Sequence, residues 1–405
     1  MGKIMLLILI IFDLCNRSAF ANSLNVELAT TDLNLGPDYT ILLFGGIFVI
    51  FMQAGFALVE GGYEKTPRTL RCLGITYLSS IFGSVLFTGI CFVLEQLGWV
   101  QGSSWIFTHL QGWHWSLIFF YTLMASTITT IVGRIIPVQA SLWVYWLCGI
   151  VVAGIIFPFY SSWVWGNLIL NISWLKEIGF VDFAGSTVVH SMAAWIVLAG
   201  YLVAGREYQQ QMIKRDIIFK DYKILSMALA CFVLWLAWSG LNIVYISAFD
   251  VNVSTVVINA LSALFTAILT AVGLSVWMSR TVVWGSLVKA GIGGLVAVTA
   301  GCNILSVSNA AFVGLSAALI TWFMPVVLTR WIASQHIRDV LVIHGLCGVW
   351  GTLWLGVMSS LSFHSVSYIS LQVQFLGVVV AFIWSFVVAY LLFVILRKAF
   401  IKSNV

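Results

Sequence analysis

DFAGSTVVH, at Asp182–His190, begins one apolar segment of the chain, and DVLVIH, at Asp339–His344, begins another. Each places a carboxylate first and a histidine one or two helical turns further in. The whole chain is 61% hydrophobic and 8% charged, whereas a soluble domain is about 25% charged. An ionisable side chain at membrane depth is costly and marks a functional site by default. We therefore expect the chemistry of this protein at the two histidines.

The composition predicts an all-α polytopic membrane protein without a second soluble domain. Its apolar runs are long, which argues against the short alternating segments of an outer-membrane barrel. A transmembrane helix needs about 17–25 apolar residues. By that criterion we predict eleven transmembrane helices, at 39–60, 72–95, 115–133, 138–158, 182–204, 224–247, 253–277, 284–305, 311–329, 340–361 and 368–396.

The N-terminus and the basic residues predict the orientation. Residues 1–21 have a positive start, an apolar run and a small-residue end, as a signal peptide cut after Ala21 would; an uncleaved first span is the alternative. The mature membrane domain is then 22–405, with its N-terminus outside. Most Lys and Arg residues fall on the inner side, and Lys176 falls outside, which predicts a cytoplasmic C-terminus in an inner membrane. The net charge of +5 reports this orientation, and we expect no nucleic-acid binding.

The odd number of spans predicts an inverted repeat of five plus five helices, followed by one C-terminal helix. His190 then lies early in the fifth span and His344 early in the tenth, at equivalent positions of the two halves. Inverted repeats place their binding site near the midplane between the halves. The two histidines are therefore expected to approach each other from opposite ends.

Two buried neutral imidazoles can hydrogen-bond to each other and leave one donor and one acceptor for a small passing molecule. Packing residues between helices are the alternative for both. Asp182 lies about 12 Å from His190 along a helix, too far for a direct hydrogen bond. It is expected to cap its helix or to supply negative potential, and Asp339 could cap the helix of His344.

Several stretches resemble the ammonium transporter/methylammonium permease/Rh superfamily, on its ammonium-transporter side. DFAGSTVVHSMAAWIVLAGYLVAGR is similar to the family signature, and DVLVIHGLCGVWGTLWLG to its second histidine motif. Supporting stretches are FMQAGFALVEGG (Phe51–Gly62), GLVAVTAGC (Gly294–Cys302) and Trp238-x-Gly240-x-Asn242. The resemblance covers nearly the whole mature chain. It implies eleven spans, a homotrimer, one pore in each subunit, and ammonium, ammonia or methylammonium as the substrate.

The resemblance also implies residue roles. His190 and His344 match the twin pore histidines, and Asp182 matches an aspartate near the outer vestibule. Trp165 matches the tryptophan that walls an external cation site, where it would hold ammonium by a cation–π contact. Trp238 belongs to the sixth-span motif at the same outer vestibule.

The outer gate departs from the family pattern. The sixth span has Leu241 and Tyr245 where the family usually has a gate phenylalanine and a serine. The third-span gate phenylalanine falls at Leu123 or Met124. We therefore expect an altered outer site without its two gating aromatic rings.

Two further departures concern the inner side. Lys289 replaces a small or amide residue at the start of the eighth span, where it either snorkels to the interface or acts at the inner pore exit. The tail RKAFIKSNV is short, which predicts no tight regulation by a PII-type protein.

The function expected from these residues is ammonium or ammonia transport for nitrogen uptake across a bacterial inner membrane, among membrane lipids. The alternative is an ammonium-binding sensor that conducts poorly. An enzyme is not expected, because the sequence has no nucleophile elbow, HExxH or Walker loop. No cofactor or metal is expected either, because the two histidines lack a third ligand.

Overall fold

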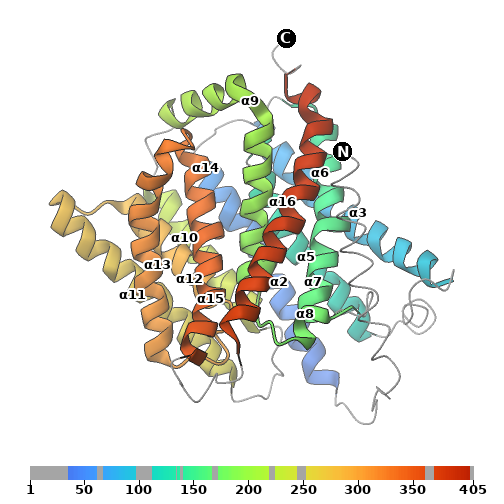
Figure 1. Ribbon diagram of the computed structural model, residues 1–405, viewed down its shortest axis with the longest axis horizontal. Helices are drawn as coiled ribbons and strands as arrows, with labels where there is room; N and C mark the ends of the chain where they lie inside the picture. Colours follow the sequence, from blue (N-terminus) through green and yellow to red (C-terminus); the bar gives the residue numbers. More distant parts are fainter. Residues whose placement is uncertain are drawn as a thin grey trace.

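The computed structural model describes residues 35–61, 67–96, 112–133, 135–136, 140–166, 172–218, 224–243, 252–360 and 369–401. Regular secondary structure in these ranges is helical throughout, and none of the described residues forms a strand (Figure 1). This confirms the all-helical prediction. The predicted signal peptide at 1–21 and Tyr245 lie outside the described residues.

The first five predicted spans all fall on helices. The first three are α2 (Leu35–Gly61), α3 (Pro67–Gln96) and α5 (Gly112–Gly133). The fourth is one continuous helix made of α6 (Leu142–Val151), η1 (Val152–Ile156) and α7 (Phe157–Trp165). The short α8 (Trp174–Glu177) follows, and the fifth span is η2 (Ser186–Ser191) with α9 (Met192–Ile218). The fifth of these segments carries His190.

The remaining predicted spans fall on helices as well. The sixth to eighth are α10 (Ile224–Ile243), α11 (Asn252–Ser279) and α12 (Trp284–Val298), and the ninth is α13 (Val307–Val327) with the 3-10 turn η3 (Leu328–Arg330). The tenth is one continuous helix made of α14 (Gln335–Val340), η4 (Leu341–Leu346) and α15 (Cys347–Ser360). The last is α16 (Leu371–Ile401). The segment from α14 to α15 carries His344.

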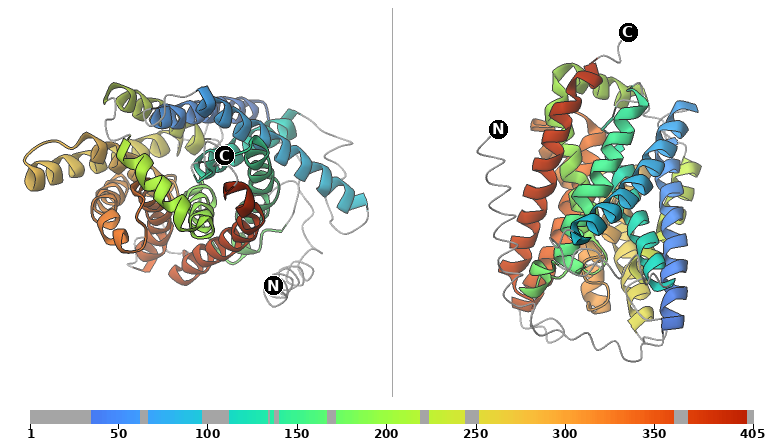
Figure 2. Two further views of the ribbon diagram at one scale, coloured as in Figure 1. Left: turned by 90° about the horizontal axis from the view of Figure 1, so that it is seen from above. Right: turned by 90° about the vertical axis from the view of Figure 1, so that its right-hand side faces the viewer.

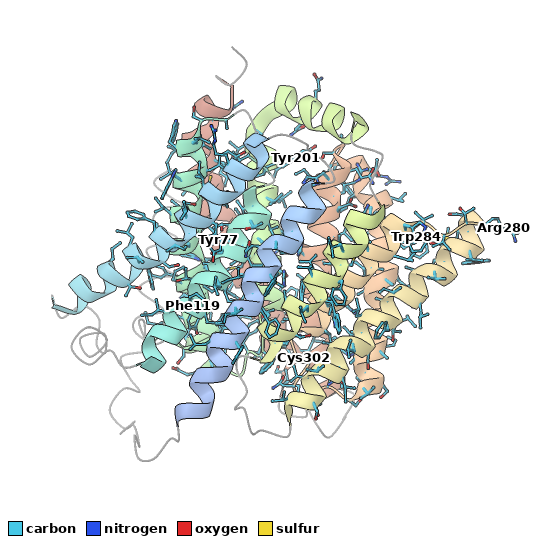
Figure 3. The ribbon with its side chains drawn as sticks, turned by 180° about the vertical axis from the view of Figure 1, so that it is seen from behind. Tyr77, Phe119, Tyr201, Arg280, Trp284 and Cys302 are labelled. Atoms are coloured by element: carbon cyan, nitrogen blue, oxygen red, sulfur yellow. The ribbon has the colours of Figure 1, made fainter. Side chains whose placement is uncertain are left out.

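These helices have the length and the surface of a membrane protein. Six helices in the described part are long and apolar enough to cross a membrane, and five shorter apolar helices accompany them. Large apolar side chains point away from the bundle, among them Ile395 at 74% exposure and Val326 at 73%. Trp284 and Arg280 lie together beside the far end of α11, at the edge of the bundle (Figure 3). Such an apolar outer surface suits lipid.

The packing of the helices brings the two histidine segments together. The first helices of the two predicted halves, α2 and α10, pack against each other. The turns η2 and η4, which hold His190 and His344, are also in contact, and α9 packs along α16. Figure 2, from above, shows these helices gathered into one bundle.

Among the helix boundaries that differ from the predicted ranges, those of the fourth and eighth spans have a clear local reason. The fourth span was expected at 138–158, yet its helix runs from Leu142 to Trp165 and stops where Gly166 adopts a φ of 58°. The eighth span was expected to reach residue 305, yet α12 ends at Val298. The amide Nδ2 of Asn259 donates to the carbonyls of Cys302 (Figure 3) and Leu305 at 2.8 and 2.7 Å. This side chain stabilises a buried apolar turn that hydropathy cannot distinguish from helix.

Close helix packing beside the site depends on glycine. A Cβ atom at Gly351 of α15 would overlap the backbone oxygen of Ala297 in α12. Gly351→Ala is therefore expected to lower the unfolding temperature of the purified protein by several degrees, because overpacking costs about 1–3 kcal/mol. Tryptophan fluorescence during heating in detergent measures this shift.

Gly273→Ala on α11 is the matched control, because no described atom lies within 4 Å of its Cβ position. Alanine in a helix is favoured over glycine by about 0.5–1 kcal/mol, so this variant should unfold at the wild-type temperature or above it. Equal unfolding temperatures for the two variants would contradict the close contact between α15 and α12.

Candidate functional site

The site begins at the N-terminus of η2, where Asp182 caps the helix. Its Oδ1 accepts hydrogen bonds from the backbone N–H groups of Gly185 and Ser186 at 3.1 and 2.8 Å. Its Oδ2 accepts from those of Thr187 and Val188 at 2.7 and 2.8 Å. A helix begins with four N–H groups that have no partner within it, and this buried carboxylate satisfies all four. The prediction that Asp182 caps its helix is confirmed.

The two histidine segments are widened into π-helical turns at corresponding places. η2 spans Ser186–Ser191 and includes His190, while η4 spans Leu341–Leu346 and includes His344. Single π-turns inside α-helices occur frequently at functional sites, because the extra residue redirects the side chains around it. Sequence periodicity does not reveal such a turn, and neither one was predicted.

Polar contacts fix η2 against the neighbouring helices. The Ser186 hydroxyl lies 2.7 Å from the carbonyl oxygen of Val296 and 3.0 Å from that of Gly348. The hydroxyls of Thr187 and Thr352 lie 2.8 Å apart. These contacts join η2 to α12 and α15 and so set the position of His190.

His190 and His344 meet in the interior of the bundle. Their Nδ1 atoms lie 3.3 Å apart, and the two rings stack with centroids 5.3 Å apart and planes at 18°. Both side chains are buried, and the Nε2 of His190 has no hydrogen-bond partner among the described residues. Since one Nδ1 must donate and the other accept, the pair has opposite tautomers. The Nε2 of His190 is therefore the nitrogen of the pair that a small molecule can reach by hydrogen bonding, and the predicted approach of the two rings is confirmed.

Aromatic rings cover both sides of the histidine pair. Trp238 stacks on His190 with centroids 4.8 Å apart and planes at 14°, and its Nε1 donates to the Thr299 hydroxyl at 2.8 Å. Phe56 meets His344 edge to face at 6.0 Å. Trp238, which the resemblance groups with the outer vestibule, thus lies directly against the pair. Phe56 belongs to the stretch FMQAGFALVEGG (Phe51–Gly62), and the sequence predicts no role for its ring.

A second aromatic cluster surrounds Trp165, in the last turn of α7. Its Nε1 donates to the backbone oxygen of Asp182 at 2.7 Å, which ties its ring to the start of the His190 helix. The rings of Tyr121 and Phe157 lie 6.1 and 6.3 Å from that of Trp165. A cluster of ring faces is a suitable wall for a small cation.

Tyr121 belongs to the third span, which also holds Leu123 and Met124. Leu123 lies two residues further along α5, and two residues turn a helix by about 200°, so Leu123 points away from the Tyr121 side. Leu123, Met124 and Leu241 are all buried in the core. The third span therefore contributes the Tyr121 ring to the Trp165 cluster, and the role predicted for Leu123 or Met124 at the outer gate stays a prediction.

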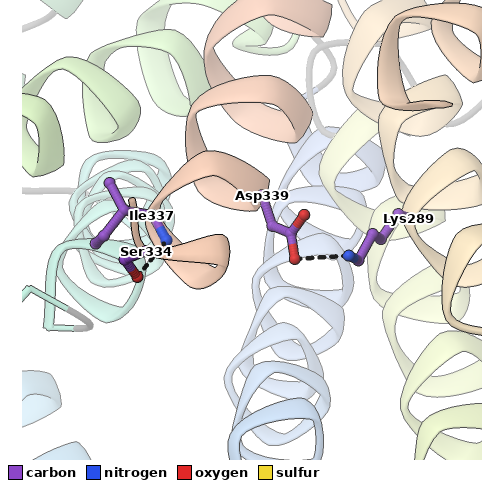
Figure 4. A network of polar contacts seen from close by, with 4 residues as sticks. All are labelled: Lys289, Ser334, Ile337 and Asp339. Atoms are coloured by element: carbon purple, nitrogen blue, oxygen red, sulfur yellow. Dashed lines mark hydrogen bonds and ion pairs between the residues drawn. The ribbon is translucent and has the colours of Figure 1, made fainter. Parts of the chain in front are cut away.

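The predicted role of Asp339 is wrong. The N-cap of α14 is Ser334, whose hydroxyl accepts from the backbone N–H of Ile337 at 3.4 Å. Asp339 lies inside α14, and its Oδ2 forms an ion pair with the Nζ of Lys289 at 2.7 Å (Figure 4). A serine just before the helix supplied the cap, so the carboxylate is available to the lysine of α12.

No group of three His, Cys, Asp or Glu side chains in the described ranges could hold a metal ion. The arrangement around the histidine pair is instead a buried donor–acceptor pair between aromatic rings. It suits the passage or binding of a small neutral molecule, and the Trp165 cluster suits a small cation.

Comparison with known proteins relates this chain to ammonium transporters. Residues 40–402 match the Ammonium Transporter Family. The chain is 29% identical over 379 residues to a putative ammonium transporter of Synechocystis sp., covering 89% of this chain and 69% of that protein. It is 27% identical over 433 residues to ammonium transporter Amt2 of Archaeoglobus fulgidus, covering 98% and 90%.

Solved structures agree with the sequence relatives. A structure titled Sensor Amt Protein superimposes with a TM-score of 0.72 at 26% identity, covering 90% of this chain and 94% of that one. Candida albicans Mep2 superimposes with a TM-score of 0.68 at 20% identity, covering 88% and 83%. The second likeness concerns the fold alone.

Proposed function

Since the chain belongs to the Ammonium Transporter Family, we propose that it carries ammonium or ammonia across the membrane along a path past His190 and His344. The observation that supports this most directly is the buried contact between the two imidazoles at 3.3 Å. The Nε2 of His190 has no hydrogen-bond partner among the described residues, so it can bind a small polar molecule in this buried place. Ammonia both donates and accepts hydrogen bonds, so it matches this pair.

The cation is recruited outside the histidine pair and crosses it without its charge. The rings of Trp165, Tyr121 and Phe157 attract ammonium by cation–π contact, worth about 0.5–2 kcal/mol. An unpaired ion buried in an apolar interior would cost far more than that contact supplies. Loss of a proton before the histidines avoids this cost, because the neutral molecule meets a hydrogen-bonding partner at each ring.

Asp182 acts in this function as a positioning residue. Its two oxygens are occupied by four backbone N–H groups, so it holds the start of the His190 helix in place. The bond from Trp165 to the backbone of Asp182 couples the cation cluster to the same point. The negative charge still favours cations nearby.

The same proposal includes the arrangement in the membrane. Eleven spans form two inverted halves of five and a final helix, with the N-terminus outside, the C-terminus inside and a signal peptide removed. Contacts between α2 and α10 and between η2 and η4 support the pairing of the halves. The subunit assembles as a homotrimer in the inner membrane.

A sensor is the second candidate function. It is favoured by the similarity to the structure titled Sensor Amt Protein, at 26% identity over 90% of this chain. A sensor would bind ammonium at the Trp165 cluster and conduct little of it. A transporter and a sensor could therefore bind ammonium equally well, but only the transporter would carry a substantial flux of it across the membrane.

Reconstitution into liposomes separates these candidates. Ammonium pulses on a solid-supported membrane report charge movement, and a pH dye inside the vesicles reports ammonia entry. Transport predicts a sustained current, or internal alkalinisation faster than in protein-free liposomes. Silence in both recordings, together with calorimetric binding of ammonium, would favour the sensor.

Trp165→Leu is expected to raise the ammonium concentration that gives half-maximal transport by about 5- to 30-fold, which corresponds to roughly 1–2 kcal/mol of cation–π energy. Trp331→Leu, which removes an exposed ring near the start of α14, is the matched control and should leave this concentration unchanged. An unchanged concentration in Trp165→Leu would remove this ring from cation recruitment.

A further inference from the structure

A charged pair lies between α12 and α14, close to the His344 segment. The Nζ of Lys289 and the Oδ2 of Asp339 are 2.7 Å apart, and the two side chains are 23% and 11% exposed. Figure 4 shows the contact bridging the two helices. A lysine at membrane depth is expensive unless it is paired. The pair offsets part of this cost, and a neutral residue at position 289 would avoid it altogether.

The pair lies one to two helical turns from the segments that hold the histidines. Asp339 precedes His344 by five residues, which is about 7.5 Å along the helix. Lys289 precedes Val296 by seven residues, about two turns, so both lie on the same face of α12. The Val296 carbonyl contacts the Ser186 hydroxyl, and α12 packs against both η2 and η4. In the proposed orientation the pair lies on the inner side of His344.

The chemistry of the lysine resembles that of the proposed substrate. Its head is a substituted ammonium ion, and it occupies a carboxylate oxygen in the way a free ammonium ion would. A tethered group has an effective concentration on the order of millimolar or above. A travelling ammonium ion would have to displace Lys289 to use this carboxylate, and it would meet a fixed positive charge when it tried.

We propose that Lys289 is a charge-selectivity residue, whose ammonium group fills the cation position at Asp339 and restricts the inner half of the path to uncharged ammonia. This inference rests on the proposed transport function and specifies the form in which nitrogen leaves. A chain with a neutral residue at position 289 would leave this carboxylate without its lysine, and its negative charge would attract a cation at the same depth.

The test compares charge moved with ammonia delivered, in the same liposomes. Current on a solid-supported membrane gives the charge, and the internal pH dye gives the ammonia. Lys289→Gln is expected to raise the charge moved per ammonia roughly tenfold, which equals about 1.4 kcal/mol for the cation. Lys289→Arg keeps the charge and should keep the wild-type ratio.

Further variants test whether the change in ratio depends on the Asp339 carboxylate or follows from the loss of any positive charge. Arg330→Gln removes an exposed positive charge from η3, which precedes α14, and should leave the ratio unchanged. The double variant Lys289→Gln/Asp339→Asn removes the carboxylate as well, so its ratio should fall back toward the wild-type value. Lys289→Cys offers a second route, because a thiol reagent that adds an aminoethyl group restores the charge and should lower the ratio again.

The outcomes for the two proposals are distinguishable. Ammonia flux in the wild type with an identical ratio in Lys289→Gln and Lys289→Cys would overturn the charge-selectivity role and leave transport standing. Absence of any flux in wild-type liposomes would overturn the transport function, and this inference with it.

Discussion

Methylammonium uptake by cells that express His190→Ala or His344→Ala is expected to fall by roughly tenfold to a hundredfold. Each substitution removes one of the two hydrogen-bonding partners that a neutral molecule meets in the apolar interior. A buried polar group that loses its partner costs about 1–3 kcal/mol, and each 1.4 kcal/mol is a factor of ten. The remaining histidine also loses the 3.3 Å contact between Nδ1 atoms that fixes its tautomer.

His190→Gln and His344→Gln are the conservative comparisons for these variants. The glutamine amide can donate and accept hydrogen bonds, so uptake should recover part of the loss. Unfolding temperatures of all four variants report whether the bundle is intact. Wild-type uptake in a folded His190→Ala or His344→Ala protein would show that the imidazoles only fill space between the helices.

Asp182→Ala is expected to prevent recovery of folded protein, or to lower its unfolding temperature by more than any other single substitution discussed here. The change leaves four buried backbone N–H groups without an acceptor. At about 1–3 kcal/mol for each, the total is comparable to the whole stability of many domains. Heating in detergent, followed by tryptophan fluorescence, measures the effect.

The variant Asp182→Asn shows how much of the stabilisation comes from the hydrogen bonds of the cap and how much from the negative charge. One amide oxygen can still accept two N–H bonds, but the NH₂ group cannot accept the other two, so this variant should unfold between Asp182→Ala and the wild type. Glu177→Ala removes an exposed carboxylate from α8 and should leave the unfolding temperature unchanged. A normal unfolding temperature for Asp182→Ala would contradict the cap.

The placement of the histidines could be predicted from the sequence because it depends on long apolar segments and their order. An apolar run of membrane length has one dominant physical interpretation, and an ionisable residue inside it is conspicuous. The predicted inverted order of the two halves put His190 and His344 at equivalent positions, and their rings do meet. The cap at Asp182 was predictable too, because a carboxylate just before a helix has few alternatives.

Other features depend on side chains that are distant in sequence. Lys289 reaches Asp339 across two helices, and nothing in either local sequence indicates that pairing. Asp339 was assigned as a cap, because a sequence pattern does not show that Ser334 starts the helix earlier. No sequence motif indicates that the Tyr121 ring lies beside that of Trp165.

The π-helical turns at η2 and η4 had no sequence signal at all. Their extra residue changes the hydrogen-bonding register without changing the apolar pattern, so the predicted helices continued straight through them. Trp238 was assigned to the vestibule, and its stacking on His190 depends on how α10 packs beside η2 and α12.

The most direct test of the twin-histidine path is a paired recording of charge movement and internal pH in liposomes that contain wild-type protein, His190→Ala or His344→Ala. The wild type should give an ammonium-dependent current or alkalinisation well above that of protein-free liposomes, and both variants should lose most of it. Wild-type signals that equal the protein-free background, or variants that transport as the wild type does, would contradict a path past His190 and His344.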